Sequence, residues 1–363
     1  MTALTGFATM YREREALPLR TRLLFTFGAV AALHLAAVVL LLVGAAGAAQ
    51  PLALGLVVTA YVAGIKHSYD WDHIAAIDNS TRKFVAQRKD PVSVGFAFSL
   101  GHSSVVIAAG MLVVAGASMI GQFMEDGTTG NKVLGLIGSG VSGLFLLAMG
   151  LFNGSAFFRA AHAYRSVRAG GEVRPEDLEA KGFVARLLAK PLRKVERPRN
   201  IYVIGFLFGL GFDTATEVSL LILAGGAAAS ALPWYAILTL PVLFAAGMSL
   251  LDSLDGCLMN FAYGWALSRP VRRVYYNIVI TALSVAVALG IGSIELISLL
   301  VERAGISSGP LAAIGGIDLD AVGYTVVALF VCTWILALGV WRFGHIEERW
   351  AAPVRDTDTS PGG

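Results

Sequence analysis

The sequence predicts an all-α membrane protein, a polytopic bundle of about eight transmembrane helices. Two observations on composition point to this class. Of the 363 residues, 56% are hydrophobic and only 15% are charged, and the mean hydropathy is +0.69. A soluble domain carries about 25% charged residues. The composition therefore excludes intrinsic disorder, a disulfide-stapled scaffold and a soluble catalytic domain.

The third observation is the spacing of the apolar segments, because a membrane-spanning helix needs about 20 mostly apolar residues. Five long segments contain no Asp, Glu, Lys or Arg, and three more are interrupted by charge. The uncharged segments are 23–49, 91–123, 133–158, 274–294 and 321–341, and the interrupted segments are 51–80, 200–227 and 234–267. Each segment is expected to form one transmembrane helix.

These helices divide the chain into three parts. Residues 1–22 form a polar N-terminal segment, residues 23–345 the eight-helix transmembrane domain, and residues 346–363 a tail that is expected to be disordered. The longest connection within the transmembrane domain is the basic loop 159–199. The first apolar segment is too long for a signal peptide and is expected to remain as a membrane anchor.

The positions of the basic residues predict the orientation of the bundle. With eight helices, all but three of the 28 lysines and arginines lie on the side of the two termini; the exceptions are Lys66, Lys132 and Arg303. Because basic loops stay in the cytoplasm, both termini and the loop 159–199 are expected to be cytoplasmic. A bacterial inner-membrane protein has this arrangement.

Ionisable residues inside the predicted helices mark a candidate site. A central Asp costs about 2.5–3.5 kcal/mol in a membrane helix, so six carboxylates and three histidines must face one another, a cation or a wet cavity. The nine residues are His67, Asp70, Asp72, His73, His102, Asp213, Glu217, Asp252 and Asp255. A purely structural network is the alternative. Asp78 and Arg82 form a further i, i+4 pair, expected near the cytoplasmic surface with a structural role.

The nine residues fall at similar depths on four predicted helices, so they can converge on one site. Asp213 and Glu217 are four residues apart and share a helix face. His67 and His73 are six residues apart and point in different directions from a regular helix. Either the helix opens between them, or the two histidines serve different positions along a path.

Imidazole nitrogen combined with carboxylate oxygen favours a divalent transition metal such as Ni²⁺, Co²⁺, Zn²⁺ or Fe²⁺. The two cysteines, Cys257 and Cys332, lie within predicted helices and are expected to pack as small apolar residues. Without thiolates in the cluster, a Cu⁺ site or a structural zinc site is disfavoured. The residue types do not choose among nickel, cobalt, zinc and iron.

A weak internal similarity relates the second and third predicted helices to the fifth and sixth. The sequence from Phe98 to Ser103 aligns with the sequence from Phe244 to Ser249, and Asp70 then lies near Asp213. Because the offset is three helices, the two copies would have opposite orientations. An inverted-topology repeat with a site between its halves is the resulting prediction.

Four motifs resemble those of the nickel/cobalt transporter (NiCoT) family of secondary permeases. The family signature H-x4-D-H is present as His67, Asp72 and His73. The other motifs occur in the same order along the chain, at 98–106, 211–217 and 247–255. Lys66, Ser68 and Trp71 are mild departures from the family pattern. The resemblance covers roughly residues 20–345.

The resemblance implies high-affinity uptake of Ni²⁺ or Co²⁺, with the metal recognised by His67, Asp72 and His73 and helped by His102. The remaining acidic residues would complete or relay the site. The metal is then a transported substrate, with no permanently bound cofactor, no nucleic-acid partner and no ATPase subunit. An exporter of the same metals and an intramembrane metalloenzyme with an open coordination position are the alternatives.

Overall fold

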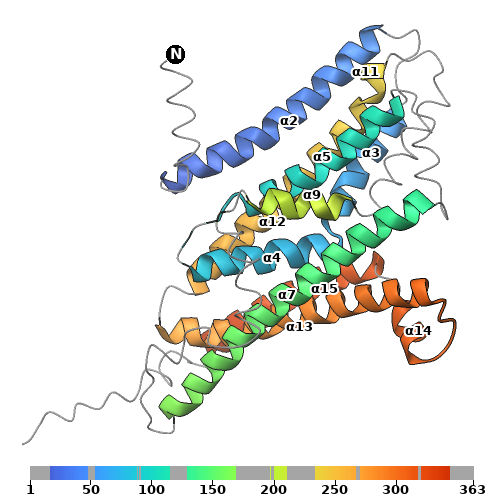
Figure 1. The fold of residues 1–363 in the computed structure, drawn as a ribbon. Coiled ribbons are helices and arrows are strands. Elements are labelled where there is room, and N and C mark those ends of the chain that lie inside the picture. The colour runs from blue at the N-terminus through green and yellow to red at the C-terminus, as the bar shows by residue number, and fades with distance from the viewer. Residues whose placement is uncertain are drawn as a thin grey trace, which may run out of the picture.

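The computed structural model is helical wherever it describes regular structure, and no strand occurs in those residues. The described residues are 17–47, 54–87, 89, 91–114, 129–168, 197, 200–210, 234–266, 270–317 and 320–343. Long helices run side by side through the molecule, and shorter ones lie between them (Figure 1). The N-terminal 16 residues, the tail 346–363 and most of the loop 159–199 lie outside the described ranges.

Six helices are long. They are α2 (Leu19–Gly47), α5 (Val94–Val114), α7 (Thr129–Arg168), α12 (Thr239–Ala266), α13 (Pro270–Ala304) and α15 (Asp320–Phe343). The shorter helices are α3 (Leu54–Ser68), α4 (Trp71–Ala86), α9 (Ile201–Gly209), α11 (Trp234–Ile237) and α14 (Pro310–Gly315).

Four of these helices are long and apolar enough to cross a bilayer, within α2, α5, α12 and α13. Shorter apolar stretches occur in α7 at Ser139–Ser155 and in α15 at Ala328–Ala337. The predicted class, an all-α polytopic membrane protein, is confirmed. The count of eight spans also depends on residues 115–128 and 211–233, outside the described ranges, and stays a prediction.

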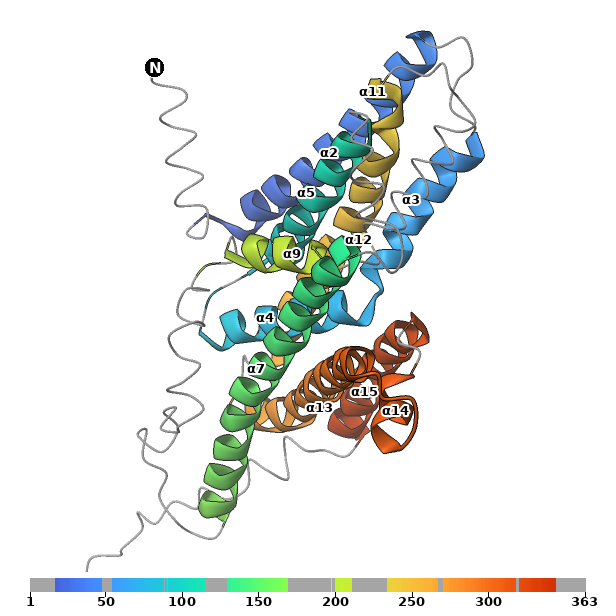
Figure 2. The ribbon, with the colours of Figure 1, turned by 45° about the vertical axis from the view of Figure 1, so that its right-hand side comes forward.

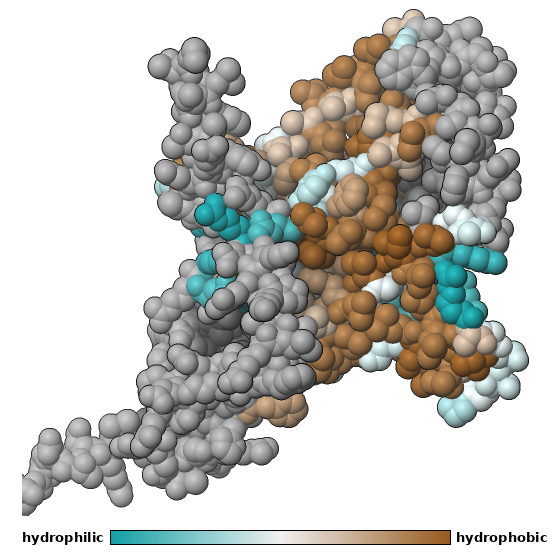
Figure 3. Space-filling view, viewed as in Figure 1, coloured by the Kyte–Doolittle hydropathy of each residue, from teal (hydrophilic) through white to brown (hydrophobic). Residues whose placement is uncertain are grey.

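The surface of the described residues agrees with a lipid environment. Apolar side chains form a broad band across the helices, with polar patches toward opposite ends of the molecule (Figure 3). Large apolar side chains such as Leu24, Leu42, Leu258 and Leu336 are more than 60% exposed. Exposed apolar area on this scale is unusual for a soluble monomer and is expected where a helix faces lipid.

The fourth predicted span ends at residue 158, but its helix continues into the loop 159–199, because α7 runs to Arg168. Alanine and arginine dominate this stretch, and both favour helix even where the apolar pattern has ended. Apolarity therefore marks where α7 can lie in lipid, while helix propensity decides where α7 stops.

The single helix expected over 51–80 is two helices in the structure. α3 ends at Ser68 and α4 begins at Trp71. The amides of Tyr69 and Asp70 bond the carbonyls of Lys66 and His67 at 3.0 Å, which closes a tight turn. Asp70 then adopts an extended backbone, with φ −62° and ψ 140°. Figure 2 shows α4 leaving α3 at an angle.

α4 lies at the centre of the helix packing. It contacts α5, α7, α12, α13 and α15, and every residue from His73 to Phe84 is buried. The helix is enclosed by protein rather than lipid, so its polar residues can be satisfied by neighbouring helices.

Close backbone contact positions α3 against α12. A methyl group added to Gly64 would overlap the backbone oxygen of Phe244, and one added to Gly247 would lie 2.5 Å from the backbone oxygen of Tyr61. Small residues at such crossings allow membrane helices to pack backbone against backbone. The crossing lies just before His67, so it fixes the end of α3 that carries this histidine.

An equivalent crossing joins α9 to α5. A Cβ at Gly205 would overlap the backbone oxygen of Phe98, and a Cβ at Gly101 would overlap that of Tyr202. α9 ends at Gly209, four residues beyond Gly205, as α3 ends four residues beyond Gly64.

The two crossings support the predicted inverted repeat. Tyr-x2-Gly of α3 meets Phe-x2-Gly of α12, and Tyr-x2-Gly of α9 meets Phe-x2-Gly of α5. The first helix of each half therefore packs on the second helix of the other half. This pairing matches the proposed alignment of 98–103 with 244–249. When Gly64 is aligned with Gly205, however, the residue that aligns with Asp213 is Asp72 and not Asp70.

Replacing Gly64 by alanine is expected to destabilise the protein by about 1–3 kcal/mol, because the added methyl forces α3 away from the α12 backbone. Thermal unfolding of the detergent-purified chain measures the effect. Gly55→Ala on the same helix is the matched control, since a Cβ at Gly55 meets nothing within 4 Å. Equal melting temperatures for the two variants would contradict the crossing.

Candidate metal centre

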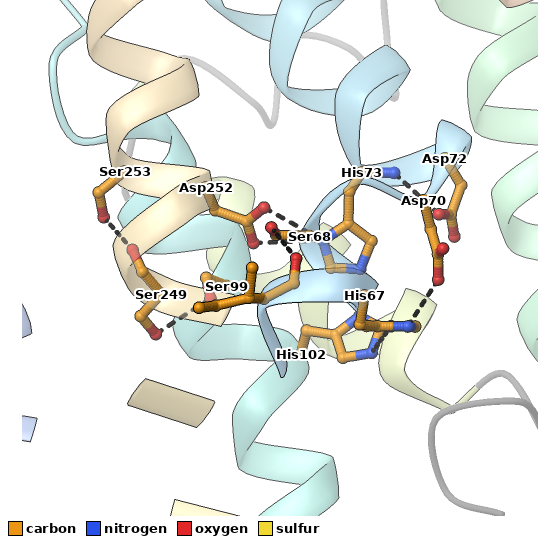
Figure 4. A network of polar contacts seen from close by, with 11 residues as sticks. His67, Ser68, Asp70, Asp72, His73, Ser99, His102, Ser249, Asp252 and Ser253 are labelled. Atoms are coloured by element: carbon orange, nitrogen blue, oxygen red, sulfur yellow. Dashed lines mark hydrogen bonds and ion pairs between the residues drawn. The ribbon is translucent and has the colours of Figure 1, made fainter. Parts of the chain in front are cut away.

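Three buried histidines from three helices meet at the break between α3 and α4. His67 lies in the last turn of α3, His73 in the first turn of α4, and His102 in α5. One nitrogen from each ring lies within 4.8 Å of the other two. The ring centroids are 4.7–5.0 Å apart. Figure 4 shows the three imidazoles turned toward a common point.

The distance between two of these nitrogens fits a shared ion. His67 Nε2 lies 3.2 Å from His102 Nε2. Two nitrogens bound about 2.0–2.1 Å from one metal ion lie about 3 Å apart for ordinary bond angles. His73 Nε2 is buried and has no hydrogen-bond partner. A buried nitrogen lone pair without a partner costs free energy unless a ligand satisfies it.

Carboxylates hold the outer nitrogens of two of the rings. His67 Nδ1 donates to Asp70 Oδ2 at 2.6 Å, and His73 Nδ1 donates to Asp252 Oδ2 at 3.2 Å. The His73–Asp252 pair is completely buried, with 0% of either side chain exposed. Each of these two imidazoles therefore has one nitrogen on a carboxylate and the other on the side of the cluster (Figure 4).

Aromatic rings and α5 hydroxyls surround the cluster. Phe98 packs against His73 and Phe244 against His67, with centroids 4.8 and 5.6 Å apart. Ser99 Oγ of α5 lies 3.0 Å from Ser249 Oγ of α12. These groups enclose the imidazoles in protein, where their orientation is set by packing.

The remaining predicted site residues have other places. Asp72 accepts a hydrogen bond from the amide of His73 at 2.8 Å, at the start of α4. Asp255 lies further along α12, and its Oδ2 is buried without a hydrogen-bond partner. Asp213 and Glu217 lie outside the described residues. Among the described residues, the group whose side chains could together hold a metal ion consists of the three histidines.

The donor set favours a late first-row divalent ion. Neutral imidazole suits nickel, cobalt, copper, zinc and iron. Neither cysteine belongs to the group: Cys257 donates to the backbone oxygen of Val92, and Cys332 is exposed. Three imidazoles leave coordination positions open, which suits an ion that must bind and leave.

A second buried polar group surrounds Asp78. Tyr263 on α12 and Ser284 on α13 both donate to its carboxylate, Ser284 at 2.6 Å. Asp78 is fully buried and Arg82 is only 7% exposed. Both members of this i, i+4 pair are therefore covered by protein, since α4 packs against five helices, and the expectation that they lie near the cytoplasmic surface stays a prediction.

Sequence reasoning missed several other buried polar residues. Asn153 on α7 donates to Asn79 Oδ1 at 2.8 Å, and Asn79 donates to the backbone oxygen of Ala75. Glu295 on α13 is also buried, one residue beyond the predicted span 274–294. The available signal was the presence of Asn and Tyr within apolar segments, which ionisable residues alone do not reveal.

Comparison with known proteins adds to this geometry. A family model described as high-affinity nickel-transport protein matches residues 53–340. The nickel transporter NicT of Mycobacterium tuberculosis is 47% identical over 93% of both chains. The nickel transporter NixA of Staphylococcus aureus is 43% identical over 84% of this chain and 90% of its own length. The cobalt transport protein NhlF of Rhodococcus rhodochrous is 38% identical over 91% of this chain and 94% of its own. No solved structure matches the chain significantly.

Tyr263→Phe is expected to destabilise the protein by about 1.5–3 kcal/mol, because it removes one of the two hydroxyls that donate to the buried Asp78 carboxylate. Tyr202→Phe is the control, since Tyr202 donates to the neutral Ser104 hydroxyl and a neutral bond contributes about 0.5–1.5 kcal/mol. Both are measured by thermal unfolding in detergent. A larger loss for Tyr202→Phe would argue against a charged carboxylate at Asp78.

Proposed function

Because the chain belongs to the family of high-affinity nickel-transport proteins, we propose that it imports Ni²⁺ or Co²⁺ across the bacterial cytoplasmic membrane through the three-histidine cluster. Members of this family are transporters and not enzymes. Relatives named for nickel and for cobalt both align over most of the chain, which supports either ion as the substrate.

The convergence of His67, His73 and His102 is the observation that carries the proposal. Three imidazole nitrogens within 4.8 Å form a site for the ion after it has lost most of its water. Asp70 and Asp252 place negative charge beside the imidazoles, and Asp72, Asp213, Glu217 and Asp255 are expected to complete or relay the site. The negative charge offsets the cost of placing a divalent cation in the low-dielectric interior.

The proposed orientation places both termini and the loop 159–199 in the cytoplasm, with residues 23–345 as the permease domain. Lys132 and Arg303 are the two basic residues expected on the outer side. Arg303 at the end of α13 donates to the backbone oxygen of Lys132 near the start of α7, so both residues lie at the same end of the bundle, as the topology requires.

The membrane potential supplies a driving force for this direction. The sequence contains no G-x4-G-K-[ST] motif for binding ATP phosphates. Entry of a cation along an inside-negative potential is favourable by about 2.3 kcal/mol per charge per 100 mV. The proposed transporter therefore acts as a single secondary permease, without an ATPase subunit or a resident cofactor.

Uptake of ⁶³Ni²⁺ and ⁵⁷Co²⁺ by cells expressing the chain tests the proposal. Accumulation is expected to rise above that of cells without it. His67→Ala and His73→Ala are each expected to lower this uptake at least about tenfold, because each removes one of three nitrogen ligands. Cys332→Ala is the matched control for expression and insertion, since this exposed residue lies on α15 outside the cluster.

Two results would contradict different parts of the proposal. Unchanged uptake in both histidine variants would remove the site assignment while leaving the transport function. Reduced accumulation and increased nickel resistance in cells carrying the unaltered chain would indicate export of the metal.

A further inference from the structure

Two histidines of the cluster share one arrangement that the ligand assignment does not explain. In each, Nδ1 lies on a carboxylate while Nε2 remains on the inner side: His67 with Asp70 at 2.6 Å, and His73 with Asp252 at 3.2 Å. The two carboxylates come from different parts of the chain, one from the α3–α4 turn and one from α12.

The chemistry of imidazole determines which nitrogen of each ring carries the hydrogen. A neutral imidazole has one N–H and one lone pair. An ionised carboxylate only accepts hydrogen bonds, so the hydrogen of each ring lies on Nδ1 and the lone pair lies on Nε2. In each ring the carboxylate oxygen contacts Nδ1, which lies on the opposite side of the ring from the direction in which Nε2 points. An ion bound at Nε2 is therefore out of reach of that oxygen.

We propose that Asp252 and Asp70 are positioning residues that fix His73 and His67 with Nε2 toward the transported ion, and that neither carboxylate binds the ion itself. The inference rests on the proposed function and deepens it. It distinguishes the residues that bind the ion from the residues that orient those ligands. Metal-binding histidines generally donate their second nitrogen to such an outer partner.

The packing around Asp252 supports a fixed position. A Cβ at Gly95 of α5 would overlap the backbone oxygen of Asp252, so the two helices touch at this residue. The Asp252 side chain is fully buried and contacts His73 of α4. The packing of α12 on α5 and this contact with α4 therefore fix the Asp252 carboxylate, which in turn holds His73.

Asp252→Asn tests the proposal because asparagine has the same shape as aspartate. Its amide can donate to Nδ1, which would move the imidazole hydrogen to Nε2 and block the lone pair. Ni²⁺ affinity of the detergent-purified full chain is expected to fall about 10–100-fold, measured by competition with a chelating dye. Ser253→Ala is the control, since its hydroxyl bonds Ser249 O within α12.

X-ray absorption at the nickel edge separates positioning from direct ligation. At saturating Ni²⁺, the original chain is expected to show three imidazole ligands and Asp252→Asn only two, because His73 can no longer bind. If Asp252 is a ligand, the variant keeps all three imidazoles and loses an oxygen. That result, or an unchanged affinity, overturns the proposal.

Asp70→Asn provides a second variant if Asp252→Asn does not fold, because the Asp70 side chain is 31% exposed. It is expected to lower Ni²⁺ affinity by the same range and to remove the His67 imidazole from the spectrum. An unaltered chain that binds Ni²⁺ without imidazole ligands would instead defeat the three-histidine site on which the proposed function rests, so the two failures are distinguishable.

Discussion

The site depends on the interruption between α3 and α4. On a continuous helix, His67 and His73 would point in different directions, and no rearrangement of side chains would bring both to one ion. The turn at Tyr69 and Asp70 changes the direction of the chain, so that both imidazoles face the same point. It also places the carbonyl end of α3, where the helix dipole is negative, beside the imidazoles. The positive start of α4 faces the same region, and Asp70 and Asp72 lie there to offset it.

Composition and apolar spacing were sufficient to predict the class, most helix positions and the histidines. The break was left open because neither glycine nor proline marks it; its signal was the geometric conflict between His67 and His73. The pairing of His73 with Asp252 could not be predicted, since it depends on how α4 and α12 cross. The burial of Asp78 and Arg82 could not be predicted for a related reason: a polar helix end covered by five helices has the same local sequence pattern as one in water.

The two halves of the repeat have different chemistry at equivalent positions. Alignment by the glycine crossings sets Phe208 opposite His67 and Met248 opposite His102. Both Phe208 and Met248 are buried. The second half therefore has apolar packing residues at the positions where the first half has imidazoles. Among its described residues, the one that reaches the cluster is Asp252, which contacts His73 across the interface. The three histidines belong to one half and the carboxylate that orients His73 belongs to the other. A movement of one half relative to the other would therefore disturb the geometry of the imidazoles.

The paired crossings also bear on the ancestry of the chain. Tyr-x2-Gly against Phe-x2-Gly, formed twice with the partners exchanged, is the contact pattern of an antiparallel dimer of identical subunits. A gene for a half-length polypeptide that inserted in both orientations would produce such a dimer, and tandem duplication with fusion would fix each copy in one orientation. In a protein of that origin, the histidines at 67 and 102 would need to be kept in one copy only.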